Sequence, residues 1–195
     1  MNLVLSMAAF ALAASLSPGP VNLVALGAGA RHGFRASLRH VTGATVGFTL
    51  LLVLTGLGLH EILLRWPGLA DLVRWAGVAF LVYLAIRLAA DDGRLSAGPS
   101  EAGPTMLAGA VMQWLNPKAW LAAVAGTGAY LADGDPARVW LFAGIYFVIC
   151  YLSVGSWAYA GAHLRRHLDR PARIRTFNRL MAALLAGSAL FLLDA

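Results

Sequence analysis

The chain has 195 residues, of which 59% are hydrophobic and 12% are charged, and its mean hydropathy is +0.71. Because about a quarter of the residues in a typical soluble domain are charged, this composition excludes an ordinary soluble protein and predicts an integral membrane protein. The single cysteine, Cys150, excludes a disulfide framework, and we interpret the net charge of +6 as basic cytoplasmic loops, with no nucleic-acid partner.

In chain order, six long apolar segments predict an all-α membrane protein with six transmembrane helices, since about 20 residues cross a bilayer. The first and fourth segments contain proline near their middle, where it removes a backbone donor and breaks a helix. Broken backbone at membrane depth needs protein or a water-filled cavity to receive its polar groups. The expected helices are Leu3–Ala30, Ala36–His60, Leu69–Ala90, Pro104–Ala132, Ala137–His163 and Ile174–Leu193.

A polar connector, residues 91–103, divides the chain into two halves of three helices, residues 1–90 and 104–195. Because three is odd, the second half must start from the opposite side of the membrane, which is the geometry of an inverted repeat. When the halves are offset by 99 residues, Pro18 in the first break aligns with Pro117 in the second. The sequence therefore predicts one transmembrane transporter domain, residues 1–195, with an inverted three-plus-three repeat and helices 1 and 4 broken at proline motifs.

The distribution of basic residues predicts the orientation of the chain. The first, third and fifth loops together hold eleven arginines, whereas the other side holds only three. Cytoplasmic loops carry an excess of Lys and Arg, so we expect both termini to face outward. The basic fifth loop could also bind anionic lipid headgroups.

Each proline break creates a new helix start. Asn116 is typical of a helix N-cap and Pro117 of a first helical position, and Gly19-Pro20 can play the same part in the first half, with Ser17 nearby. Each second half-helix then presents unpaired N–H groups and the positive end of its dipole to the protein centre. Two such ends converging from opposite sides predict a site for a carboxylate. The alternative is a pair of kinks that only shape packing.

Lys118 follows the second break and is the only lysine of the chain, because the other fourteen basic residues are arginine. A charge near the middle of an apolar segment costs at least ~2.5 kcal/mol and is by default functional. Its ammonium could bind a substrate carboxylate and, because burial disfavours a charged amine, could also exchange a proton during transport. The alternative is a lysine that snorkels or pairs with backbone carbonyls at the break.

Three amide side chains near the breaks, Asn22, Gln113 and Asn116, could help unwound backbone carbonyls to hold a substrate ammonium, although Asn22 and Gln113 could equally join helices. The acidic residues all fall in loops or at segment ends, and the sequence has no apparent His or Cys cluster. We therefore expect neither a metal site nor a cofactor. Ser17 with Lys118 lacks the flanking signature of a catalytic dyad, so we do not expect an enzyme.

Two further patterns concern packing. Gly43 and Gly47, four residues apart in the second helix, are expected to let it approach a neighbour closely. Trp114 and Trp120 flank the second break, where they could line a cavity or pack in the core.

Three blocks of sequence carry a family resemblance. The first begins at Ser17-Pro18-Gly19-Pro20, the second runs from Gln113 to Trp120, and the third is Phe177–Leu180. Together they resemble the LysE/RhtB family of amino-acid exporters over nearly the whole chain. The resemblance implies proton-driven export of amino acids or their derivatives from the bacterial cytoplasm, and thus a multi-pass protein of the inner membrane. The motif positions that carry over are Pro18, Gly19, Pro20, Asn116, Pro117 and Lys118.

The chain departs from the family pattern beside the presumed cavity, so the resemblance does not identify the substrate. Val21 stands where many members have a polar residue, and Gly126–Tyr130 replaces an aromatic-rich stretch that ends in Pro-Gln-Phe.

From these observations we expect a secondary transporter that exports amino acids or their derivatives by alternating access at a midplane site. Its expected partners are a small-molecule substrate and the lipid bilayer, and the sequence also allows a homo-oligomer. Two alternatives are a small-ion or metal exporter of related fold and a membrane scaffold or assembly factor that transports nothing.

Overall fold

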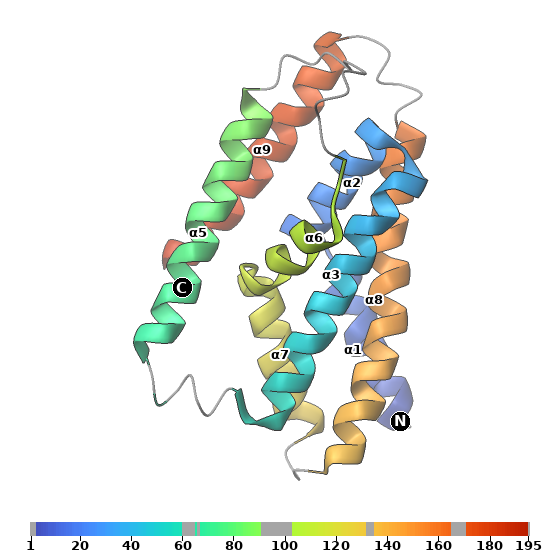
Figure 1. Cartoon of the computed structure of the whole chain (residues 1–195), viewed down its shortest axis with the longest axis vertical. Helices are drawn as coiled ribbons and strands as arrows, with labels where there is room; N and C mark the ends of the chain where they lie inside the picture. The colour runs from blue at the N-terminus through green and yellow to red at the C-terminus, as the bar shows by residue number, and fades with distance from the viewer. Residues whose placement is uncertain are drawn as a thin grey trace.

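The computed structural model describes residues 3–59, 65, 67–90, 103–131, 135–164 and 171–194, and within them it contains helices and no strand (Figure 1). The predicted all-α class is therefore confirmed. Most of the expected connector, residues 91–102, lies outside the described residues. The elements are α1 Leu3–Leu16, α2 Pro20–His32, α3 Phe34–Leu54, the π-helical η1 Thr55–Leu59, α5 Pro67–Ala89, α6 Met106–Trp114, α7 Pro117–Tyr130, α8 Pro136–Leu164 and α9 Pro171–Asp194.

Proline marks the start of most of these helices. A proline at the first helical position costs little, because the N–H group that it lacks would have no intrahelical partner there, and its fixed φ suits the helix. This explains why the apolar sequence divides where it does. The helices that begin at proline are α2, α5, α7, α8 and α9.

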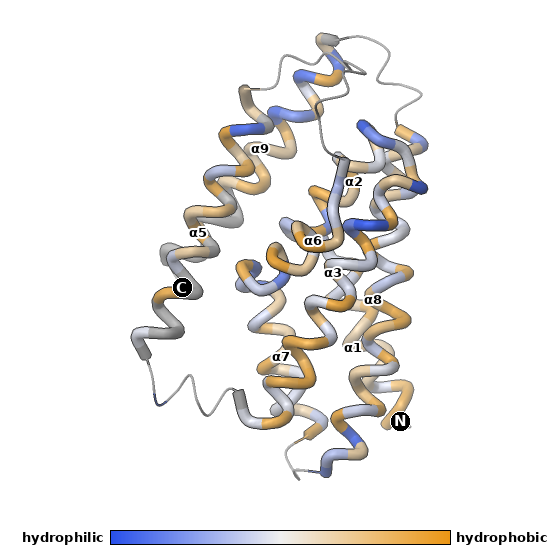
Figure 2. The backbone as a smooth tube through the Cα atoms, viewed as in Figure 1, coloured by the Kyte–Doolittle hydropathy of each residue, from blue (hydrophilic) through white to orange (hydrophobic). Residues whose placement is uncertain are grey.

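Two helical segments are long and apolar enough to cross a membrane, Phe34–Gly58 and Pro136–Leu164. α1 and α2 pass the same test as a single span that is bent by 61° between them. Figure 2 shows apolar residues along the middle of α3 and α8, with hydrophilic residues gathered near the junction of α2 and α3. Within the described residues, two or three of the six expected spans therefore meet this criterion.

The main core forms where α1, α2, α3 and α8 pack together with α6 and α7. The most extensively packed helix pairs are α2 with α8, α3 with α6, and α5 with α9. In Figure 1, α5 and α9 run alongside each other on one flank of the molecule. A smaller apolar cluster that includes Leu23 of α2, Val78 of α5 and Leu185 of α9 joins this pair to the rest.

Glycines set the close approach of α3 and α6. A Cβ atom added at Gly43 would overlap the backbone of Met106, and one at Gly47 would meet the backbone of Ala110. Small residues allow such contacts between helix backbones in membranes. The predicted packing role of Gly43 and Gly47 is confirmed.

We expect Gly43→Ala to lower the thermal stability of the purified protein, because α3 and α6 would have to separate to admit the methyl group. Overpacking of this kind typically costs about 1–3 kcal/mol. Gly144→Ala in α8 is the matched control, since a Cβ there meets no atom within 4 Å. Thermal unfolding in detergent measures both variants. A Gly43→Ala melting temperature equal to that of wild type would contradict the packing argument.

Candidate functional site

The helical backbone is interrupted at two places that lie next to each other in space. α1 ends at Leu16 and α2 begins at Pro20, while α6 ends at Trp114 and α7 begins at Pro117. Lys118 joins the two interruptions, because its Nζ donates to the backbone carbonyls of Ser17 and, at 3.2 Å, of Pro18. These hydrogen bonds connect the start of α7 to the end of α1, about a hundred residues away in the sequence.

Gly19 lies directly against this lysine. Its φ of −171° and ψ of 172° are extended backbone, which any residue can adopt. A Cβ atom at Gly19, however, would lie 3.0 Å from Lys118 Cδ and 3.2 Å from Lys118 Nζ. Glycine therefore leaves room here, and the lysine side chain occupies it, so a larger residue would require the end of that side chain to shift.

Asn22 and Lys118 together satisfy the carbonyl groups that the first interruption frees. Asn22 Nδ2 donates to the carbonyls of Ser15 at 2.8 Å and Ser17 at 2.9 Å, and Lys118 donates to Ser17 and Pro18. Carbonyls at the end of a helix have no intrahelical donor, and leaving them unpaired in a low-dielectric interior is costly. Of the two roles predicted for Asn22, joining helices is the one that its amide group performs in this conformation.

A tryptophan indole satisfies the last carbonyl of each interrupted helix. Trp157 Nε1 donates to the carbonyl of Leu16 at 3.0 Å, and Trp120 Nε1 donates to the carbonyl of Trp114 at 2.8 Å. Trp114 and Trp120 also contact each other edge to face, with ring centroids 6.0 Å apart. These tryptophans brace the interruptions, and neither Trp114 nor Trp120 is among the residues that line the cavity described below.

Asn116 is the N-cap of α7, as the sequence predicts. Its Oδ1 accepts a hydrogen bond of 3.2 Å from the backbone N–H of Lys118, and Pro117 is the first residue of the helix. Asn116 Nδ2 donates to Gln113 Oε1 at 3.3 Å, so the buried cap also ties α7 to α6.

At the first interruption, Gly19 is the N-cap of α2 and Pro20 its first residue, and no side chain caps the helix. Ser17, expected nearby as a helper, instead donates from its hydroxyl to the carbonyl of Ala14 at 3.2 Å. The hydroxyl of Ser17 therefore serves the end of α1 rather than the start of α2.

The two helix starts consequently differ in the donors that they leave available. In α2 the first intrahelical bond runs from the N–H of Leu23 to the carbonyl of Gly19 at 2.9 Å, so the N–H groups of Val21 and Asn22 precede it. In α7 the first donors are bound by the side chain and carbonyl of Asn116. The positive helix end with free donors is that of α2.

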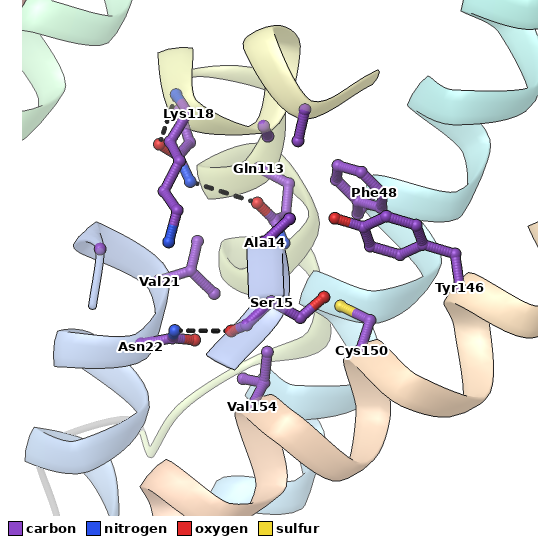
Figure 3. Close-up of a pocket in the computed structure, with 14 residues that line it drawn as sticks. Ala14, Ser15, Val21, Asn22, Phe48, Gln113, Lys118, Tyr146, Cys150 and Val154 are labelled. Carbon is purple, nitrogen blue, oxygen red and sulfur yellow. Dashed lines mark hydrogen bonds between the residues drawn. The ribbon is translucent and has the colours of Figure 1, made fainter. Parts of the chain in front are cut away.

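A small cavity, about 30 Å³ in volume, lies between the two interruptions (Figure 3). It has room for about one or two water molecules. Lys118 is the only charged residue among those that line it, so the cavity favours an anionic group. Its lining consists of Ala14, Ser15, Gly19, Val21, Asn22, Phe48, Gln113, Asn116, Lys118, Ala119, Ala122, Tyr146, Cys150 and Val154.

The structure brings five of the nine sequence-predicted site residues to this cavity and uses the other four to shape the interruptions. Those on the cavity are Gly19, Asn22, Gln113, Asn116 and Lys118. The others, which do not line it, are Ser17, Pro18, Pro20 and Pro117.

Sequence reasoning missed the side of the cavity formed by α1, α3 and α8. Ser15, Phe48, Tyr146 and Cys150 line it and belong to no short motif. One signal was available: Tyr146 and Cys150 are four residues apart, which places them on one face of a helix.

Comparison with known proteins finds sequences similar to this chain. The sequence pattern of the LysE type translocator family matches residues 12–195. The chain is 30% identical over 182 residues to the cysteine/O-acetylserine efflux proteins of Escherichia coli (strain K12) and Shigella flexneri, covering 90% of each chain. The efflux protein of the same description from Escherichia coli O1:K1 / APEC is 28% identical over 178 residues. No solved structure matches the chain.

We expect Asn116→Ala to destabilise the protein by about 0.5–2 kcal/mol, because it removes a helix cap inside the protein. Asn116→Ser should recover part of this loss, since serine can also cap. Thr105→Ala is the control, because it removes an exposed cap from α6, where Thr105 Oγ1 accepts from Ala108 N–H at 3.1 Å. Thermal unfolding compares the three variants, and an Asn116→Ala protein as stable as wild type would disprove the role of the cap.

Proposed function

The chain belongs to the family of LysE type translocators and is embedded in the membrane, and on that premise we propose that it exports a small amino acid or amino-acid derivative from the cytoplasm. Relatives at 30% identity are cysteine/O-acetylserine efflux proteins, which supports amino-acid-like substrates. The observation that carries the proposal is the placement of the only lysine, Lys118, on a cavity between two interrupted helices.

We infer that the transporter is a single domain, residues 1–195, in which α1–α2 and α6–α7 are two broken spans of an inverted three-plus-three repeat. The two breaks would then lie near the bilayer midplane and approach the substrate from opposite sides. The excess of arginine in the odd loops supports termini that face outward from the inner membrane of a bacterium.

Lys118 is the proposed anchor for the substrate carboxylate. An ammonium carries three donors, and the carbonyls of Ser17 and Pro18 accept two of them, which leaves one for a ligand. The N–H groups of Val21 and Asn22 at the start of α2 add donors and a positive dipole end, a combination that suits a carboxylate.

The substrate ammonium would face Gln113 and Asn116, whose side-chain oxygens each retain a second lone pair. Since the cavity holds only about 30 Å³, an amino acid requires it to widen. A carboxylate that competes with the carbonyls of Ser17 and Pro18 for Lys118 would loosen the tie between the two breaks. This competition links substrate binding to the movement that alternating access needs.

Lys118 is also the proposed coupling residue. Its amine can exchange a proton during transport. For the inward proton gradient to drive export, a proton must enter the cell as the substrate leaves.

We expect Lys118→Met to reduce amino-acid efflux from proteoliposomes at least about tenfold. A hydrogen bond to a charged group is worth about 1.5–3 kcal/mol, and each 1.4 kcal/mol is a factor of ten. Arg138→Gln is the control, because it removes a basic residue whose exposed side chain lies 3.9 Å from Asp135 at the start of α8. Wild-type efflux by a correctly folded Lys118→Met protein would exclude Lys118 from the mechanism.

Cells loaded with a panel of amino acids as dipeptides should export at least one of them faster with this protein than without it. Addition of a protonophore should abolish the difference, because the collapsed gradient no longer supplies the driving force. Efflux that persists unchanged after the gradient is collapsed would contradict proton coupling while leaving export itself intact.

A further inference from the structure

The cavity has a second polar side, away from Lys118. Ser15 on α1 and Tyr146 and Cys150 on α8 line it, and Figure 3 shows these three side chains facing one another, away from Lys118. Their exposed fractions are 8%, 2% and 2%. We call these three residues the polar wall.

The hydroxyl of Ser15 is the unusual member of the polar wall. Its backbone carbonyl is bound by Asn22, whereas its buried Oγ makes no hydrogen bond of standard geometry and lies close to the side chains of Tyr146 and Cys150. Buried polar groups in native proteins are nearly always paired, so such a group needs an explanation. The amide groups of Asn22 and Asn116, across the cavity, all have partners by contrast.

The aromatic residues beside the polar wall restrict what can reach it. Phe48 of α3 stacks on Tyr146 with ring centroids 4.3 Å apart, and Phe142 contacts Tyr146 edge to face at 5.8 Å. Since the rings of Phe48 and Tyr146 line the cavity there and its volume is about 30 Å³, a group that reaches Ser15 must be short.

We propose that the polar wall is the subsite for the substrate side chain and selects short polar groups, such as a hydroxyl, a thiol or a small ester, over apolar groups of the same size. This inference rests on the proposed export function. A substrate whose carboxylate lies at Lys118 would direct its side chain across the cavity to the polar wall. Ser15 and Tyr146 both donate and accept, and the Cys150 thiol adds a soft, weakly polar contact.

Ser153 provides a matched control within the same helix as Cys150. Its hydroxyl is also buried and makes no hydrogen bond of standard geometry, yet Ser153 is not among the residues that line the cavity. If only the loss of a buried hydroxyl matters, Ser15→Ala and Ser153→Ala should therefore have the same effect on efflux. If Ser15 contacts the substrate side chain, only Ser15→Ala should change substrate selection.

The test is efflux from proteoliposomes loaded with equal concentrations of serine, cysteine, alanine and 2-aminobutyrate. The readout is the ratio of polar to apolar efflux, serine to alanine and cysteine to 2-aminobutyrate. Because the two amino acids of each pair pass through the same folded transporter molecules, this ratio does not depend on how many molecules are folded. We expect wild type to prefer serine over alanine and cysteine over 2-aminobutyrate. Ser15→Ala should reduce this preference about fivefold, whereas Ser153→Ala should leave the preference unchanged.

Cys150→Ala should weaken the preference for cysteine over 2-aminobutyrate, and Cys150→Ser should retain a preference for serine over alanine. Export with an unaltered ratio in Ser15→Ala, or an equal change in Ser153→Ala, would overturn the subsite alone. If wild type exports no amino acid of this panel or of the dipeptide panel, the proposed function fails and the subsite fails with it.

Discussion

The structure depends on how the carbonyl groups freed at the end of α1 are satisfied. A helix that stops inside the protein leaves its last carbonyls without intrahelical donors. Here Asn22, Trp157 and Lys118 supply the missing donors, each from a different helix. These carbonyls are therefore satisfied only when α2, α7 and α8 are in place, so three other helices meet at the end of α1.

This constraint gives the two interruptions different chemistry. At the start of α7, Asn116 accepts hydrogen bonds from the first backbone N–H groups of the helix. At the start of α2, no side chain caps the helix, and its first N–H groups remain available. Lys118 adds a positive charge from α7 to the negative end of α1. The anion-binding groups of the cavity are thus backbone from the first half and one side chain from the second.

Much of this arrangement could be predicted from the sequence, because proline and asparagine act locally. Asn116-Pro117 specifies a helix start within three residues, and Gly43 with Gly47 specifies a packed face. The partner of Lys118 could not be predicted in this way, because it lies about a hundred residues away at the other interruption. The same holds for Trp157 and for Ser15, whose roles depend on which helices meet and on no pattern within their own segments.

Gly19 carries a consequence for the evolution of this chain. Since its backbone is extended, selection for conformation does not hold it as glycine, and the room beside it is occupied by Lys118. Positions 19 and 118 should therefore vary together. A lineage that loses the lysine is free to enlarge residue 19, whereas a lineage that enlarges residue 19 first must shorten or displace the side chain at 118. A small residue at position 19 thus accommodates a long side chain at position 118.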